Sequence, residues 1–122
     1  DADADADADP SLLPFGECTA STFDYYDIDA MEFDDDVLEI TVSYSGGCAE
    51  HSFELCWNGI VSDDYVPEIQ VKLGHDSGGD MCEAYLTETL RFDAAWIGID
   101  IGSPVMVELM LFGGSSILAL YD

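Results

Sequence analysis

Short runs in which every second residue is apolar recur along this chain, and they constrain its fold more than any other feature. The clearest run covers 37–44. One of its faces carries Leu38, Ile40, Val42 and Tyr44. The other face carries Glu39, Thr41 and Ser43. A repeat of two residues is that of a β-strand with one buried face and one solvated face.

Further runs of this character cover 27–33, 51–58, 68–75, 81–93, 105–112 and 117–121. Gly, Asn and Asp residues separate them at intervals of about 8–12 residues, which is typical of antiparallel sandwiches. We therefore predict an all-β fold, an antiparallel β-sandwich of the immunoglobulin-like kind with about seven strands and no helix. The last two runs are nearly apolar on both faces, which suits the centre of a sheet or a subunit contact.

The faces of individual strands follow from the same alternation. In 27–33 it places Ile28, Ala30 and Glu32 on one face, with Met31 and Phe33 on the other. In 51–58 it turns Phe53, Leu55 and Trp57 inward and Cys56 outward. Residues 93–104 lack the pattern and are expected to form an irregular apolar corner around Trp96.

The charge of the chain restricts its partners. Asp and Glu total 27, against only Lys72 and Arg91, for a formal net charge of −25. Such a chain is repelled by nucleic acid and by anionic lipid, so we expect neither a nucleic-acid partner nor membrane insertion. The partners that this charge allows are divalent cations, basic proteins and further copies of the chain. A saline habitat would also suit this charge, because salt screens self-repulsion.

The N-terminal segment has a composition of its own. Residues 1–17 are expected to form an acidic arm and connector, with the sandwich domain over 18–122. The arm alternates two residue types before Pro10: Asp1, Ala2, Asp3, Ala4, Asp5, Ala6, Asp7, Ala8 and Asp9. In a strand its carboxylates would lie about 7 Å apart on one face and repel by roughly 0.6 kcal/mol per pair. The arm is therefore either a solvated tether or a strand held by backbone hydrogen bonds at a sheet edge, its own or a neighbour's.

Four cysteines in a small acidic domain favour disulfides and an oxidising compartment. We expect an exported protein, extracellular or at the cell surface, with Asp1 as the mature N-terminus after removal of a signal peptide. No apolar run is long enough to span a bilayer. The cysteines allow three pairings. A bond between Cys18 and Cys56 would fasten the connector across the sheet.

Two stretches carry a resemblance to a known group. They are Ser45-Gly-Gly-Cys48-x-x-His51-x-Phe53-x-Leu55-x-Trp57-x-Gly59 and Leu73-x-His75-Asp76-x-x-Gly79-Asp80-x-Cys82-Glu-Ala. Over 37–92 the chain resembles small secreted or lipoprotein domains, mostly uncharacterised, of Bacteroidetes and myxobacteria. The resemblance implies export, a β-rich fold and a Cys48–Cys82 bond, and it implies no catalytic activity.

Two kinds of metal site deserve weighing. Cys48, His51, His75 and Cys82 could instead form a Cys2His2 site, although the spacing matches no common zinc module. Calcium prefers six to eight oxygen ligands, which turn-borne carboxylates supply. The candidate calcium ligands are Asp34, Asp35, Asp36, Asp63, Asp64, Asp76 and Asp80. None has EF-hand spacing, and we expect that no cofactor is required.

The sequence does not identify a reaction that this chain would catalyse. His51 and Ser52 are adjacent strand residues, which point to opposite faces and cannot act as base and nucleophile together. We expect no enzyme. The first functional hypothesis is an extracellular structural protein whose N-terminal strand adds to a neighbouring subunit, building a fibre or surface layer. The alternative is a secreted or cell-surface module on an acidic tether that binds calcium, a basic protein or another ligand.

Overall fold

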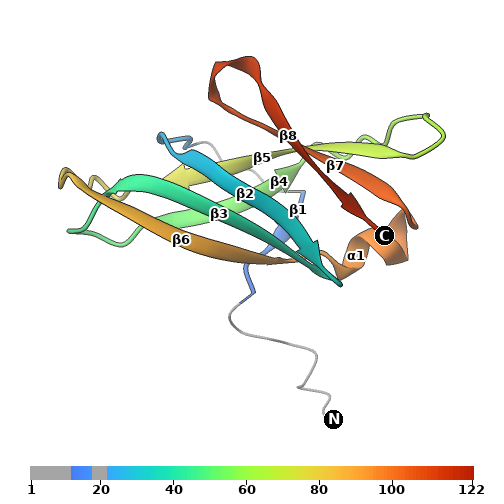
Figure 1. The fold of residues 1–122 in the computed structure, drawn as a ribbon, viewed down its shortest axis with the longest axis horizontal. Helices are drawn as coiled ribbons and strands as arrows, with labels where there is room; N and C mark the ends of the chain where they lie inside the picture. The colour runs from blue at the N-terminus through green and yellow to red at the C-terminus, as the bar shows by residue number, and fades with distance from the viewer. Residues whose placement is uncertain (1–11, 18–21) are drawn as a thin grey trace, which may run out of the picture.

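The computed structural model describes residues 12–17 and 22–122, and over these the chain is all-β with one short helix (Figure 1). The elements are β1 (Phe15–Gly16), β2 (Asp27–Asp34), β3 (Val37–Gly46), β4 (Ser52–Trp57), β5 (Glu68–Asp76), β6 (Ala84–Asp93), α1 (Ala95–Asp100), β7 (Val105–Met110), the 3-10 turn η1 (Phe112–Gly114) and β8 (Ser116–Tyr121). The prediction of an all-β fold is confirmed. The arm, residues 1–9, lies outside the described residues.

The strands form two sheets. β2, β3 and β6 make a three-stranded antiparallel sheet in that order. The other sheet has the order β1-β4-β5-β7-β8 and is mixed, because β1 runs parallel to β4 and β5 runs parallel to β7. The antiparallel arrangement expected from the sequence therefore holds throughout the smaller sheet, but in the larger sheet only for the β4–β5 and β7–β8 pairs. A parallel pair needs a long crossover, and here β6 and α1 supply it between β5 and β7.

The core lies where the alternation placed it. Leu38, Ile40 and Val42 of β3 are fully buried. They belong to one cluster with the inward residues of the larger sheet, among them Leu55, Ile69, Leu73, Val107 and Leu109. Burying such side chains supplies the main favourable term in folding.

One strand differs from the alternation predicted for it. The register of β2 against β3 shifts between Ile28 and Ala30. Such a bulge adds one residue to a strand and exchanges the faces beyond it. Ile28 therefore packs against the core with Met31 and Phe33, instead of sharing a face with Ala30 and Glu32. The prediction was wrong for Ile28, because counting every second residue cannot detect an inserted one, whereas Met31 and Phe33 share a face as predicted.

The corner predicted at 93–104 contains the helix α1, so the expectation of no helix was wrong. Six residues are too few for a helical repeat to appear in the sequence. Tertiary contacts stabilise the helix: Ala94 and Ile97 are buried, and the Asp93 carboxylate accepts the N–H of Ala95 at 3.2 Å.

The connector joins the two sheets at one side. The N–H of Leu13 donates to the carbonyl of Arg91 at 2.8 Å, and that of Asp93 donates to Leu13 at 3.2 Å. Two residues after Leu13, Phe15 and then Gly16 pair with β4. The Phe15 ring is buried and meets Trp96 edge-on, with ring centroids 5.1 Å apart. The segment thus runs from the edge of β6 to the edge of β4.

Candidate functional site

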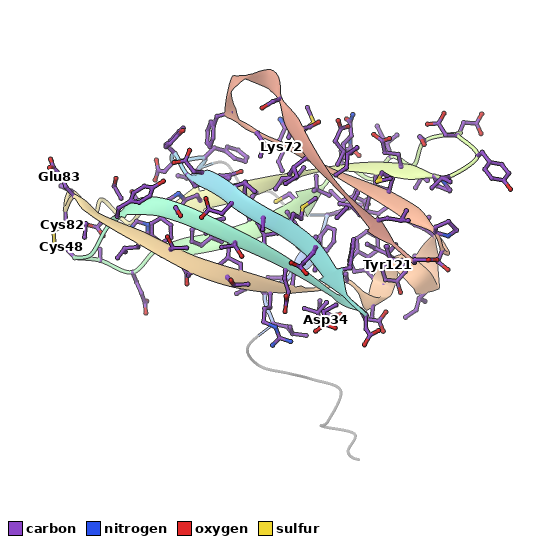
Figure 2. The ribbon with its side chains drawn as sticks, viewed as in Figure 1. Asp34, Cys48, Lys72, Cys82, Glu83 and Tyr121 are labelled. Carbon is purple, nitrogen blue, oxygen red and sulfur yellow. A yellow bond between two sulfur atoms is a disulfide. The ribbon has the colours of Figure 1, made fainter. Side chains whose placement is uncertain are left out.

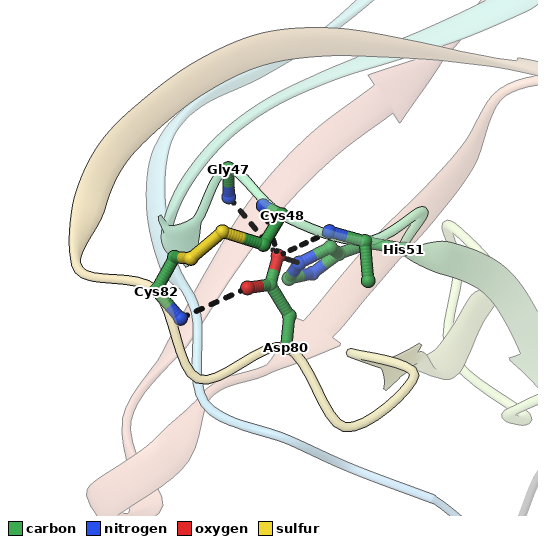
Figure 3. Close-up of a disulfide and its surroundings, with 6 residues drawn as sticks. Gly47, Cys48, His51, Asp80 and Cys82 are labelled. Atoms are coloured by element: carbon green, nitrogen blue, oxygen red, sulfur yellow. Dashed lines mark hydrogen bonds and ion pairs between the residues drawn. A yellow bond between two sulfur atoms is a disulfide. The ribbon is translucent and has the colours of Figure 1, made fainter.

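A disulfide and a buried carboxylate join two turns at one end of the molecule (Figures 2 and 3). Cys48, in the β3–β4 turn, is bonded to Cys82, which precedes β6, with Cα atoms 5.8 Å apart. The predicted Cys48–Cys82 pairing is therefore confirmed. Cys56 is also disulfide-bonded, whereas Cys18, the partner predicted for it, lies outside the described residues.

Asp80 is the centre of this cluster. Its Oδ2 atom accepts the backbone N–H groups of Gly47, Cys48 and Ala49 at 3.0–3.1 Å. The same atom lies 2.9 Å from His51 Nε2, and the Asp80 side chain is fully buried. The hydrogen bond from His51, followed by the backbone donors, holds the pKa of Asp80 well below its ordinary value. The carboxylate therefore stays ionised and acts as the acceptor that fixes the turn.

The turn sequence Gly46-Gly47 is explained by this geometry. A Cβ atom on Gly46 would lie 2.6 Å from His51 Nε2 and 2.8 Å from Asp80 Oδ2. Gly47 has φ of +114°, a conformation that side chains disfavour. Both glycines are thus required for the backbone to close over the carboxylate.

The two histidines continue the chain of contacts inward. His51 Nδ1 lies 2.7 Å from His75 Nε2, and His75 Nδ1 lies 3.2 Å from the carbonyl oxygen of Asp24. With an acceptor at each end, three ring protons are needed to satisfy every contact. Burial, the largest cause, lowers the pKa of His75, and the backbone carbonyl of Asp24 opposes that shift.

This arrangement serves structure better than metal binding. Cys48 and Cys82 bond each other and the two rings hydrogen-bond each other, so the Cys2His2 tetrahedron considered from the sequence is not assembled. Sulfur and oxygen atoms of Cys48, Asp80 and Cys82 lie within 4.8 Å of one another, but disulfide sulfurs are not thiolate ligands. The cluster crosslinks the two turns.

The candidate calcium ligands occupy separate turns. Asp34, Asp35 and Asp36 lie at the β2–β3 turn, where Asp36 accepts the Tyr121 hydroxyl at 2.7 Å. Asp63 and Asp64 are exposed between β4 and β5. Asp76 accepts the N–H of Gly78 at 2.9 Å. In the described part of the chain, the one group of three ligand-type residues brought together contains Asp80 and none of the other six acids. Calcium binding stays a prediction.

A second cluster, which sequence reasoning missed, lies on the outer surface of the three-stranded sheet. The hydroxyls of Tyr25 and Tyr85 donate to the two oxygens of Asp27 at 2.7 and 2.6 Å. Beside them Ser43 donates to Asp29 at 2.6 Å and lies 2.8 Å from the Thr87 hydroxyl. We call these residues the Asp27 face: Tyr25, Asp27, Asp29, Ser43, Tyr85 and Thr87.

The Asp27 face combines held charge with exposed rings. The bond from Tyr85, and then that from Tyr25, lowers the pKa of Asp27. Tyr25 and Tyr85 remain 65% and 63% exposed, although tyrosine rings are usually buried in part. The signal available in the sequence was the polar residues at every second position of 39–43 and 85–91, but the sequence did not show that these two strands pair.

No known protein family matches this chain, and no curated protein sequence matches it. Solved structures do. A NigD-like immunity protein from Bacteroides caccae has a TM-score of 0.63 at 13% identity, over 88% of this chain and 57% of that one. A putative toxin-related protein from Parabacteroides distasonis has a TM-score of 0.65 at 16% identity, over 91% of this chain and 61% of that one.

A protein of unknown function, DUF1344, from Bacteroides vulgatus has a TM-score of 0.61 at 11% identity, over 91% of this chain and 56% of that one. This chain thus spans less than two thirds of the length of these neighbours. At such identities the likeness establishes the fold alone. The neighbours are Bacteroidetes proteins, which agrees with the resemblance found in the sequence to that extent. In the described part of the chain, no helix is long and apolar enough to cross a membrane.

Proposed function

We propose that this chain is an exported acidic binding module, built as a β-sandwich, whose partner is a basic protein that docks on the Asp27 face. The observation that carries the proposal is the pair of exposed tyrosines whose hydroxyls hold one ionised carboxylate between them. The finer assignment of the two sheets to the immunoglobulin-like class stays a prediction.

The chemistry of this face suits a cationic partner. Carboxylates fixed in position accept the planar fork of an arginine side chain, and less directionally the ammonium of lysine. Tyrosine is among the residues that contribute most to binding at protein interfaces. Asp27 and Asp29 provide the charge, and Tyr25 and Tyr85 provide apolar contact area beside it. The net charge of −25 would accelerate encounter with such a partner at low salt.

The names of two structural neighbours support a protein as the partner class. One refers to immunity and the other to a toxin. A small acidic protein that neutralises a basic toxin is one form that the proposed module can take. The disulfide supports the exported part of the proposal, because such bonds persist in oxidising compartments.

The test compares two variants that change the net charge equally. Asp27→Asn/Asp29→Asn alters the proposed face, and Asp63→Asn/Asp64→Asn alters an exposed loop between β4 and β5. Basic exported proteins of the organism that produces this chain are purified and titrated by calorimetry at about 0.15 M salt, where the Debye length is about 8 Å. We expect a partner whose affinity falls at least tenfold with the face variant and little with the loop variant. Equal losses would show general charge attraction and refute the Asp27 face.

A second function is favoured by the position of the connector. We also propose self-assembly, in which the arm of one copy adds as a strand to another copy and so forms a fibre or surface layer. The support is Leu13, whose backbone hydrogen-bonds β6 at the edge of the three-stranded sheet, an edge to which a further strand could add. Deleting residues 1–11 should abolish assembly and leave a folded monomer by sedimentation. A full chain that stays monomeric at high concentration, with and without calcium, would refute it.

A further inference from the structure

The larger sheet contains a gap beside β5. Strand β5 pairs with β7 from Glu68 to Val71. At His75 its neighbour on that side is instead the segment 22–24, since the His75 N–H donates to Thr22 at 3.0 Å and the Asp24 N–H donates to His75 at 2.8 Å. Lys72 and Leu73 lie between these two partners. The change of partner leaves a space in the wall of the sheet.

Two hollows open at this gap, and we call them together the sheet-gap hollow. The first, about 200 Å³, is walled by apolar side chains that include Phe23, Tyr26, Met110 and Phe112. The second, about 540 Å³, shares Phe23, Lys72 and Met110 with the first and reaches Trp57. Phe23 and Phe112 are 42% and 41% exposed, so a ligand entering the gap would cover apolar surface. Volumes of about 300–1,000 Å³ are usual for sites that take small organic ligands.

Lys72 gives this hollow a distinct chemistry. It lines both parts, near the base of the β7–β8 hairpin (Figure 2). Arg91, the other basic residue, lies 3.5 Å from a Glu39 oxygen. Lys72 is exposed and makes no ion pair with any carboxylate of the described residues, although the chain has 27 acids. One ammonium at the rim of an apolar hollow is complementary to an apolar body with one anionic group.

We propose that the sheet-gap hollow binds a small amphiphile that carries a single carboxylate, with its apolar chain against Phe23, Met110 and Phe112 and its carboxylate on the Lys72 ammonium. This site has its own lining residues, and the argument for it does not rest on the proposed basic partner. Contact with Lys72 is essential, because the net charge of −25 makes the summed longer-range field of the chain repel an anion. Affinity for the amphiphile therefore rises with salt.

The experiment uses decanoate below its micelle concentration, with decanol and decyltrimethylammonium as neutral and cationic ligands of the same chain length. Binding is followed by calorimetry and by tryptophan fluorescence, to which Trp57 contributes together with Trp96, 4.9 Å away between ring centroids. The measurements are made at about 1 M sodium chloride, where the Debye length is about 3 Å. At that salt concentration the contact with Lys72 determines which of the three ligands binds most tightly. We expect saturable binding, with decanoate the tightest of the three ligands.

Lys72→Gln should weaken decanoate about two- to fivefold, the range of an exposed ion pair, and leave decanol unchanged. Arg91→Gln is the matched control with the same change in net charge, and it should leave decanoate binding unchanged. Phe112→Ala should weaken all three ligands. Equal effects of the Lys72 and Arg91 variants, tighter binding of the cation at high salt, or no saturable binding would each overturn the proposal. The proposal would also be overturned if the chain self-associates and decanoate disperses the oligomer equally well in the wild type and in Lys72→Gln. In that case a second copy of the chain occupies the hollow.

Discussion

Replacing Cys48 and Cys82 together by alanine removes the disulfide at the end of the molecule while keeping every backbone N–H that Asp80 binds. The bond spans a sequence separation of 34 residues. A loop of that length loses about 3.8 kcal/mol of chain entropy in the unfolded state at about 25 °C when it is closed. The double variant should therefore be less stable by up to about 3.8 kcal/mol.

That figure is an upper limit, because Cys56 lies inside the same loop and is itself disulfide-bonded. A second crosslink already restricts part of the segment in the unfolded chain, so we expect a loss of about 2–3.5 kcal/mol. With a slope of about 1.5–2 kcal/mol per molar urea, the midpoint of unfolding should fall by about 1–2.3 M. The slope itself should rise, since the less constrained unfolded chain exposes more surface.

The measurement is urea unfolding of the oxidised wild type and the double variant, followed by circular dichroism. Amide hydrogen exchange at Gly47, Cys48 and Ala49 is the control for an intact turn, and their protection should track the lower global stability. A loss below about 1 kcal/mol with an unchanged slope would refute the reasoning that the bond acts on the unfolded chain. Loss of protection at these amides alone would show that the bond holds the native turn instead.

Three further predictions concern the same end of the molecule and its ions. Burial lowers the pKa of His75 from 6.5, so at a pH just below that value the unfolded chain binds more protons than the folded chain. The free energy of unfolding should therefore fall as the pH is lowered from about 7.5 to about 5.5. In urea titrations, His75→Gln should flatten this pH dependence. Gly46→Ala should cost about 1–3 kcal/mol by melting, since its Cβ would lie 2.6 Å from His51 Nε2, whereas Gly16→Ala, with no atom within 4 Å, should cost far less. If the turn acids bind calcium, millimolar calcium should raise the melting temperature more than magnesium does, and an unchanged temperature would count against it.

The sequence predicted the parts of this fold that depend on alternation. Leu38, Ile40 and Val42 are buried as the period of two requires, and the Gly46-Gly47 turn separates two strands as expected. What it could not reveal is which strands become neighbours. The parallel pairing of β5 with β7 depends on the crossover through β6 and α1, and the bulge at Ile28 depends on the partner strand β3.

The same limit explains the sites. The Cys48–Cys82 bond was predicted because both residues sit in distinctive local stretches. The contacts of Asp80 with His51 and of Asp27 with Tyr85 join residues 29 and 58 positions apart. Predicting either contact requires the register between the strands. The alternation of apolar residues shows which face of a strand a side chain occupies, but it does not show that register.

The two proposed binding surfaces are not fully independent, because one pair of rings connects them. Tyr25 of the Asp27 face packs against Phe112 of the sheet-gap hollow, with ring centroids 5.1 Å apart. Tyr26 also contacts Phe112, at 5.0 Å. A ligand that displaces the Phe112 ring therefore removes a contact that positions Tyr25. By thermodynamic linkage, the factor by which the amphiphile changes the affinity for the basic partner equals the factor by which the partner changes the affinity for the amphiphile. Phe112→Ala should remove that coupling, whereas Lys72→Gln should weaken decanoate and leave the coupling between the bound ligands intact.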